Sequence, residues 1–259
     1  MLIDTHAHLN FEAFKNDLDK VIEHCLTENV WFINVGSKYE TSKKAVEIAE
    51  KYGKGVYAAI GLHPIHSNKE EFDPVRNSIS NGVDKEKYKK LARSDKVVAI
   101  GEIGLDYYKE YGLFKEKQKE VLLEQFSLAK ELNLPVIFHC RKAHEDLLEV
   151  LKSNQIRGVI HCFTGNWQQA RQYLDIGLYL GFNGIIYKLN LKEVIEKTPL
   201  ERILIETDCP YLTLPQAGID RNEPIFVKYI AEDIARIKNL DYQKVAETTT
   251  INAKNLFKI

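Results

Sequence analysis

The chain contains 259 residues, 44% of them hydrophobic, and its 36 basic and 37 acidic side chains leave a formal net charge of −1. This composition is typical of a compact globular protein and excludes a disordered tail or a fibre. Because the charges are balanced, no uniform basic field attracts nucleic acid. Any recognition of phosphate must therefore come from a local patch or from bound cations.

Neither membrane insertion nor secretion is indicated by the sequence. No run of about 18 apolar residues is present, and residues 1–6 lack the basic segment and apolar stretch of a signal peptide. The four cysteines, Cys25, Cys140, Cys162 and Cys209, have no CxxC spacing, which argues against a disulfide framework and against a zinc ribbon. We expect a cytoplasmic protein with reduced thiols and no membrane contact.

Short apolar runs alternate with helical patterns along the whole chain, and we interpret eight of these runs as buried parallel strands. They cover residues 2–4, 31–35, 56–60, 97–100, 135–138, 158–160, 178–181 and 202–205. Apolar residues recur at helical spacing in the intervening segments, for example over 18–26, 45–52 and 121–132. The last segment, 241–257, is expected to add one or two helices that close one end of the fold.

Eight strand-then-helix units in a chain of this length favour an α/β fold, the closed (β/α)8 or TIM barrel, as a single domain over residues 1–259. An open doubly wound sheet is less favoured, because it usually has fewer strands and no GxGxxG or Walker loop follows any strand here. In such a barrel the C-terminal ends of all strands meet on one face. Residues at those ends therefore converge even when they are far apart in the sequence.

Histidines and carboxylates follow most of the predicted strands, at corresponding positions of the repeat. A His-x-His pair alone is weak support for a metal site, but a set of such residues at strand ends is a specific signal. The set consists of His6, His8, His63, Glu102, His139, His161 and Asp208. These five imidazoles and two carboxylates are expected to form one site.

The residue types in this set predict a hydrolase site with two divalent cations. His6 and His8 point the same way along an extended segment, and the imidazole nitrogen is a preferred ligand of zinc and similar cations. Glu102 has two carboxylate oxygens that can bridge two cations. Asp208 can both bind a cation and accept a proton from the attacking water.

Four neighbouring side chains have a structural interpretation beside or instead of a functional one. We interpret Asp106 as a carboxylate that stabilises a turn and leave it out of the ligand set. Glu206 is two residues before Asp208 and is a candidate acceptor for a ligating histidine, with a buried structural ion pair as an equal alternative. Tyr107 and Tyr108 could line a substrate cleft by stacking, and loop packing is an equal alternative.

The same segments closely resemble the TatD family of metal-dependent deoxyribonucleases, and the resemblance covers the whole chain. The motifs that carry it are DTHAHL at 4–9, GLHP at 61–64, GEIGLDY at 101–107, FHCR at 138–141, HCFTG at 161–165, ETDCPYL at 206–212, RNEP at 221–224 and NAKNLF at 252–257. The resemblance implies a barrel hydrolase, related to the amidohydrolases, that cleaves DNA phosphodiester bonds as a 3′-5′ exonuclease.

The resemblance also implies where the cations and the substrate bind. One cation is expected on His6, His8, Glu102 and Asp208, and the other on Glu102, His139 and His161. Magnesium is commonly used in the family, whereas the ligands also suit manganese or zinc. The expected substrate is single-stranded DNA or a 3′ end, and no obligate protein partner is indicated.

Four further residues match family positions near the substrate. His63 matches a histidine close to the substrate phosphate that is usually not a metal ligand, so it is expected to stabilise the substrate or the leaving group. Arg141, Lys188 and Arg221 match basic positions at the mouth of the cleft, where they are expected to hold phosphate oxygens.

Two departures from the family pattern concern the substrate and leave the predicted ligands intact. Residues 217–220 are Ala-Gly-Ile-Asp where relatives often carry basic residues, and Cys140 and Lys142 stand where relatives often have Ser and Asp. A hydrolase of a small ester, amide or lactone therefore remains an alternative, as does a metal-dependent binding protein without activity. Glu102 argues against the first alternative, because many such barrels have a lysine at the bridging position.

Overall fold

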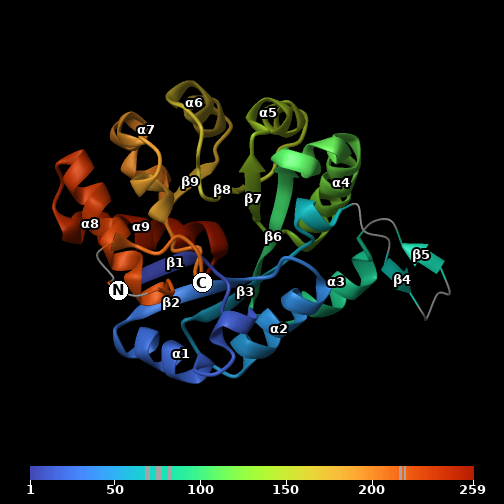
Figure 1. Ribbon diagram of the computed structural model, residues 1–259, viewed down its shortest axis with the longest axis horizontal. Coiled ribbons are helices and arrows are strands. Elements are labelled where there is room, and N and C mark those ends of the chain that lie inside the picture. The colour runs from blue at the N-terminus through green and yellow to red at the C-terminus, as the bar shows by residue number, and fades with distance from the viewer. Residues whose placement is uncertain (68–70, 74–77, 81–82, 216–217, 219) are drawn as a thin grey trace.

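Eight parallel strands form one sheet whose strand order follows the chain (Figure 1). In the computed structural model, which describes residues 1–67, 71–73, 78–80, 83–215, 218 and 220–259, they are β1 (Leu2–Ala7), β2 (Val30–Val35), β3 (Val56–Ile60), β6 (Val97–Asp106), β7 (Val136–Arg141), β8 (Gly158–Ile160), β9 (Tyr179–Phe182) and β10 (Ile203–Ile205). Each of these strands coincides with or overlaps one predicted from the sequence, so the strand predictions are confirmed.

The sheet closes into a barrel between β1 and the segment that follows β10. The Asp208 amide donates to the His6 carbonyl at 2.9 Å, and the His8 amide donates to the Cys209 carbonyl at 2.9 Å. Ala7 and Cys209 form a parallel bridge at the same place. The closing contacts therefore lie among the residues that the sequence predicts to bind metal.

Helices surround the barrel, usually one after each strand (Figure 1). They are α1 (Leu18–Thr27), α2 (Tyr39–Glu50), α3 (Lys85–Leu91), α4 (Lys115–Leu132), α5 (His144–Lys152), α6 (Trp167–Asp175), α7 (Lys192–Lys197), α8 (Val227–Lys238) and α9 (Tyr242–Phe257). The predicted helical segments fall in α1, α2 and α4. No helix within the described residues is long and apolar enough to cross a membrane.

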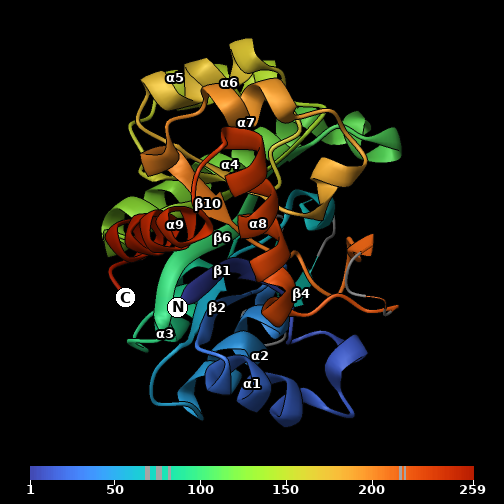
Figure 2. The ribbon, with the colours of Figure 1, turned by 90° about the vertical axis from the view of Figure 1, so that its left-hand side faces the viewer.

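The last helix, α9, closes the end of the barrel where β1 and β10 begin, and it lies within the segment 241–257 predicted to close one end (Figure 2). Its Phe257 packs in an apolar cluster with strand residues that include Ile3, Ile33 and Leu204. The Asn252 side-chain amide donates to the carbonyls of Leu200 and Ile203, at 2.8 and 2.9 Å. The segment forms one helix because the Asp241 carboxylate caps its start, accepting from the Gln243 and Lys244 amides.

Two features of the fold were not predicted. The segment between β3 and α3 contains a small antiparallel pair, β4 (Glu71–Asp73) with β5 (Ser78–Ser80). Strand β6 continues six residues beyond the predicted end at Ile100, because Gly104, Leu105 and Asp106 pair with β7. This extension carries Glu102 and Asp106 on one strand.

Candidate metal centre

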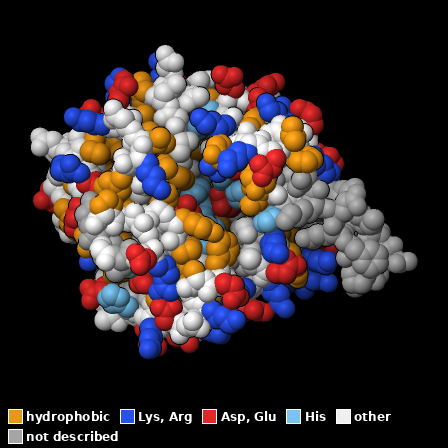
Figure 3. Space-filling view, viewed as in Figure 1, with side chains coloured by type: hydrophobic (Ala, Val, Ile, Leu, Met, Phe, Trp, Pro, Cys, Tyr) orange, Lys and Arg blue, Asp and Glu red, His pale blue; other side chains and the backbone are white. Residues whose placement is uncertain are grey.

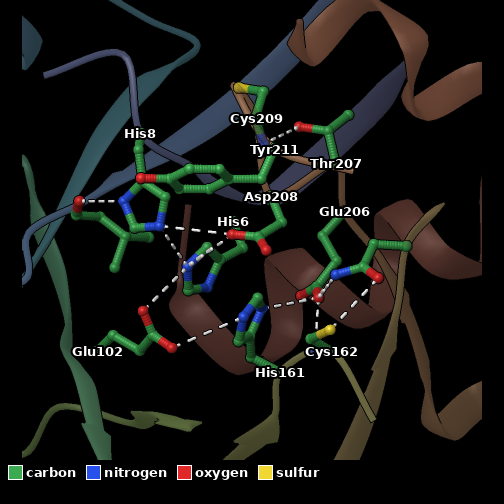
Figure 4. Close-up of polar contacts among 12 residues, drawn as sticks. His6, His8, Glu102, His161, Cys162, Glu206, Thr207, Asp208, Cys209 and Tyr211 are labelled. Carbon is green, nitrogen blue, oxygen red and sulfur yellow. Dashed lines mark hydrogen bonds and ion pairs between the residues drawn. The ribbon is translucent and has the colours of Figure 1, made fainter. Parts of the chain in front are cut away.

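The predicted site residues meet at the C-terminal ends of the strands. Figure 3 shows a hollow at the centre of one face, in which histidine and acidic side chains are visible with basic side chains around it. Figure 4 shows how several of them point toward one another. The structure brings together all seven predicted residues of the cluster: His6, His8, His63, Glu102, His139, His161 and Asp208.

His6 and His8 present their Nε2 atoms to each other at 3.1 Å (Figure 4). The His8 Nδ1 atom lies 2.8 Å from the Val35 carbonyl. Because a carbonyl only accepts, Nδ1 of His8 carries a proton, and Nε2 is the ring nitrogen that faces the cluster. Burial and the nearby His161 lower the pKa of His6, which favours its neutral ring. Two buried imidazole nitrogens that face each other in this way suit a shared cation.

Glu102 lies at the centre of the cluster. Its carboxylate oxygens are 2.7 Å from His139 Nδ1, 3.5 Å from His6 Nε2, 3.5 Å from His63 Nε2 and 3.7 Å from His161 Nε2. Burial alone would raise the pKa of this carboxyl, but the surrounding imidazoles hold the pKa well below its usual range. An ionised carboxylate shared by four imidazoles has the placement expected of a bridging ligand.

Asp106, which sequence reasoning left out, contacts the cluster. Its Oδ1 atom accepts from the Tyr108 amide at 2.9 Å, so the predicted turn-stabilising role is present. Its Oδ2 atom also lies 3.0 Å from His139 Nε2. Burial lowers the pKa of His139, but the bonds to Asp106 and Glu102 outweigh it and raise the pKa to about 9. Glu102 and Asp106 are four residues apart, so in a strand their side chains lie on the same face. The sequence alone did not show that β6 extends to Asp106, and the contact with the cluster was therefore missed.

Glu206 holds His161 in place, as the sequence suggested. Its Oε1 atom lies 2.7 Å from His161 Nδ1 and also accepts from the Cys162 amide at 2.7 Å and the Asn183 side chain at 3.0 Å. Burial lowers the pKa of His161, but Glu206 and Glu102 raise it to about 10. The Nε2 atom of His161 is left to face Glu102.

Asp208 reaches the cluster from a strained turn after β10. Its backbone has φ of 58°, in the left-handed region, where a non-glycine residue is uncommon and marks a functional or strained position. Its Oδ1 atom lies 3.5 Å from His8 Nε2 and 3.8 Å from His6 Nε2. Burial would raise the pKa of Asp208, but the three nearby imidazoles lower it. The side chain is 17% exposed, against 6% for Glu102, so Asp208 is the more accessible carboxylate.

Asp4 is a supporting residue that sequence reasoning missed. It is fully buried, and its carboxylate accepts from the Thr207 hydroxyl at 2.5 Å, the Thr207 amide at 2.9 Å and the His6 amide at 3.1 Å. Burial raises the pKa of Asp4 to about 8. These bonds tie the segment that carries His6 to the segment that carries Asp208. From the sequence alone, an aspartate at this position could equally be a metal ligand or a supporting residue.

The donor set fits divalent cations in three overlapping groups. They are His6 with His161 and Asp208, His6 with His8 and Glu102, and His63 with Glu102 and His139. The Nδ1 atom of His6 is buried without a hydrogen-bond partner in the described structure. Most buried polar atoms have such a partner, so the protein leaves this ring incompletely satisfied. Imidazole nitrogens and carboxylate oxygens are the ligand atoms that zinc and manganese prefer.

The side chain of His63 is oriented as a donor. Its Nδ1 atom accepts from the Ile65 amide at 3.2 Å, so the neutral ring carries its proton on Nε2, which faces Glu102. Burial lowers the pKa of His63, which keeps the ring neutral. An N–H that points into the cluster suits a bond to a substrate oxygen, the role that the resemblance implies for His63.

The three predicted basic contacts differ in their surroundings. Arg141 is exposed and stacks on the Tyr108 ring at 3.8 Å, and Lys188 is exposed after β9. Arg221 instead donates to both carboxylate oxygens of Asp17, at 2.9 and 2.7 Å, to Glu223 at 2.7 Å and to the Ala13 carbonyl at 2.6 Å. The donors of both terminal guanidinium nitrogens are therefore already occupied. Residues 217 and 219, part of the noted departure, lie outside the described residues.

A parallel barrel with buried imidazoles and carboxylates at the C-terminal strand ends defines a metal-dependent hydrolase. A model of the family described as TatD related DNase matches residues 3–258. The metal-dependent hydrolase YabD of Bacillus subtilis is 43% identical, and the alignment covers 100% of both chains. The chain therefore belongs to the TatD-related DNase family.

Two other relatives agree with this assignment. The 3′-5′ ssDNA/RNA exonuclease TatD of Salmonella typhimurium is 32% identical over 100% of this chain and 99% of its own length. The crystal structure of YjjV, a TatD homologue from Escherichia coli, is similar with a TM-score of 0.87 and 30% identity. It covers 100% of this chain and 98% of the other.

Proposed function

We propose that this protein is a dinuclear phosphodiesterase that removes nucleotides from the 3′ end of single-stranded DNA. The family and the named activity of the Salmonella relative support the reaction class. The observation that carries the proposal is the pair of His6 and His8 Nε2 atoms, 3.1 Å apart and beside Glu102 and Asp208. Such a buried set of lone pairs is suited to cations and to little else.

The proposed ligands divide between two cations of magnesium, manganese or zinc. His6, His8 and Asp208 would hold one cation, His139 and His161 the other, and Glu102 would contact both. When bound, two divalent cations stabilise charge on the phosphate oxygens and make water a stronger nucleophile. Asp106 and Glu206 orient His139 and His161 from behind.

Two side chains would assist the reaction, one as a proton acceptor and one as a hydrogen-bond donor. Asp208 is ionised and accessible, so it would accept a proton from water as the water oxygen attacks phosphorus. His63 would donate its Nε2 hydrogen bond to the 3′ oxygen as the bond from phosphorus to that oxygen breaks. Arg141 and Lys188 would hold non-bridging phosphate oxygens. Because the donors of Arg221 are occupied, we propose that it positions the loop of Asp17 and leave it out of the phosphate contacts.

We also infer that residues 1–259 act as one catalytic unit, in the cytoplasm and without an obligate protein partner. All of the proposed ligands come from this chain. The four cysteines are free, and three of them are buried, which fits a reducing compartment.

The test is product analysis with the metal-loaded protein. We expect a 5′-labelled linear oligodeoxynucleotide to shorten one nucleotide at a time, whereas a circular single strand of the same composition stays intact. Asp208→Asn is the matched control and should leave the linear strand uncut. Cleavage of the circle would contradict exonuclease action. Turnover of a neutral ester with no cleavage of either DNA would favour the carbon-centre hydrolase.

A further inference from the structure

A cavity of about 680 Å³ opens beside the metal centre, at the ends of β6 and β7. Its wall includes Tyr107, Tyr108, Lys115, Arg141, Lys142 and His144. No role in the proposed chemistry explains a cavity of this size. Its volume falls within the range of about 300–1,000 Å³ that is usual for small-molecule sites.

The charges on the cavity wall are predominantly positive. In the described structure, Lys115, Arg141 and Lys142 have no carboxylate within ion-pair distance. The two carboxylates at the wall are Glu145, which is exposed, and Asp146. Asp146 is already engaged by Lys119 Nζ at 2.8 Å and by the Tyr107 hydroxyl at 2.8 Å. The cavity is therefore suited to an anion.

An aromatic platform lies next to these cations. The Arg141 guanidinium lies 3.8 Å from the centre of the Tyr108 ring, and Lys115 Nζ lies 4.5 Å from the centre of the Tyr107 ring. Tyr108 is half-buried, so part of its ring is accessible. A tyrosine and a guanidinium plane beside free cations form the combination that binds single-stranded nucleic acid by base stacking and phosphate contact.

Uncompensated hydrogen-bond donors also line the cavity. Helix α5 starts at His144, and no side chain caps its first turn. The His144 Nδ1 atom lies 3.1 Å from the Tyr173 hydroxyl and 3.3 Å from Cys140 Sγ, whereas Nε2 is buried without a partner in the described part of the chain. The positively polarised start of a helix at one wall of the cavity suits a phosphate oxygen.

Two strands of the barrel lead from the metal centre to the cavity wall. Arg141 is two residues beyond His139 on β7, and Tyr108 is two residues beyond Asp106 at the end of β6. Two residues of extended chain span about 6.6 Å. This distance is comparable with the step from one phosphate to the next along a strand.

We propose that the cavity is a subsite for a second nucleotide of the substrate strand, with its base against Tyr108 and its phosphate against Lys142 and the start of α5. This inference rests on the proposed function. The subsite would let the enzyme recognise the nucleotide next to the one that it removes.

The test compares substrates with one and with several nucleotides. For Tyr108→Ala we expect KM on a tetranucleotide to rise about tenfold, because loss of one stacked base costs about 1–3 kcal/mol. The KM ratio of variant to parent on thymidine 5′-(p-nitrophenyl phosphate), which has one nucleoside, should stay near one. Tyr108→Phe should restore tetranucleotide binding. Tyr111→Ala, which removes a tyrosine outside the cavity wall, is the matched control.

Binding measured without turnover gives a second readout. With a fluorescein-labelled phosphorothioate tetranucleotide, Tyr108→Ala should weaken Kd about tenfold in fluorescence anisotropy. The logarithm of the association constant falls as the logarithm of the salt concentration rises. In Lys142→Gln this fall should be less steep by about 0.7, the value for one phosphate contact on a single strand.

The outcomes separate this inference from the proposed function. If Tyr108→Ala affects both substrates equally, Tyr108 acts through Asp106 and the subsite is wrong. The subsite would also be wrong if Tyr108→Ala and Lys142→Gln both bound the tetranucleotide as tightly as the parent protein. If the parent protein cleaves neither substrate, the proposed function itself fails.

Discussion

The two ends of the barrel are made by the same strands but have opposite chemistry. At the N-terminal end, Ile3, Ile33 and Leu204 pack against Phe257 of α9 in an apolar cluster. At the C-terminal end, the space between the strands is filled by imidazoles and carboxylates, of which His6 and Glu206 are fully buried. Burying such groups costs free energy unless each is paired, whereas burying apolar side chains stabilises the fold.

This difference shows how the barrel separates stability from activity. The apolar end can supply the free energy of folding, so the polar end can keep groups that do not satisfy one another, such as the Nδ1 atom of His6. Changes at the two ends should therefore have different consequences. Changes to the proposed metal ligands at the polar end should alter metal binding and turnover, and changes at the apolar end should alter stability.

The largest effect is expected from Glu102→Gln at the polar end. The neutral amide cannot bridge two cations, so both metals should be lost and kcat should fall about a thousandfold or more, equivalent to ~4 kcal/mol. Metal content by inductively coupled plasma spectrometry and turnover measure this loss. The circular dichroism spectrum should remain that of the parent. Retention of both metals with parental turnover would remove Glu102 from the site.

At the apolar end, Phe257→Ala should lower the free energy of unfolding by about 3 kcal/mol, because it leaves a cavity under α9. Urea unfolding measures the change, and kcat of the folded protein should not change. Ile251→Ala is the matched control, since Ile251 lies on the same helix and is 56% exposed. Equal losses in the two variants would show that α9 does not stabilise the barrel end.

The next prediction concerns pH and His144, which is buried at the polar end. Burial lowers the pKa of His144 to about 4, below its ordinary value of 6.5. Between these values the unfolded chain binds a proton that the folded chain does not, so stability falls as pH falls. From pH 7 to pH 5 this histidine should cost about 2 kcal/mol in the free energy of unfolding.

His144→Gln isolates that contribution. Between pH 7 and pH 5 the free energy of unfolding should fall in both proteins. The fall should be about 2 kcal/mol smaller in the variant than in the parent protein. Urea denaturation at the two pH values is the measurement. Identical pH dependence in both proteins would mean that His144 is not buried as a neutral ring.

The smallest effects should separate two arginines at the polar end. Arg141→Ala should raise KM for an oligonucleotide about tenfold, ~1.4 kcal/mol, and weaken its salt dependence, because a phosphate contact is lost. Arg221→Ala should instead lower the free energy of unfolding by about 1 kcal/mol, since its partly exposed ion pair with Asp17 is screened by solvent. The salt dependence of KM in the Arg221→Ala variant should equal that of the parent protein. If both variants change only KM, Arg221 contacts substrate as the resemblance implied.

Much of the fold was predictable because the strands bury both faces and therefore appear as short apolar runs. The end of β6 was not predictable, because the residues from Ile103 to Asp106 are held by backbone pairing with β7 and do not form an apolar run. For the same reason Asp106 was interpreted only as a turn residue. Its contact with His139 depends on two strands that are separated in the sequence by a whole helix.

The cluster of His6, His8, Glu102, His139, His161 and Asp208 was predictable, because parallel barrel strands present their C-terminal ends on one face. Residue type and position within the repeat were sufficient to identify it. The partners of each side chain were decided only by the tertiary structure. Arg141 and Arg221 are the same residue type near the same cleft, yet Arg221 faces Asp17 and Glu223 whereas Arg141 faces a tyrosine and a cavity. Hydrogen bonding and ion pairing depend on distances of a few ångströms between segments remote in sequence, and those distances are set by the closure of the barrel.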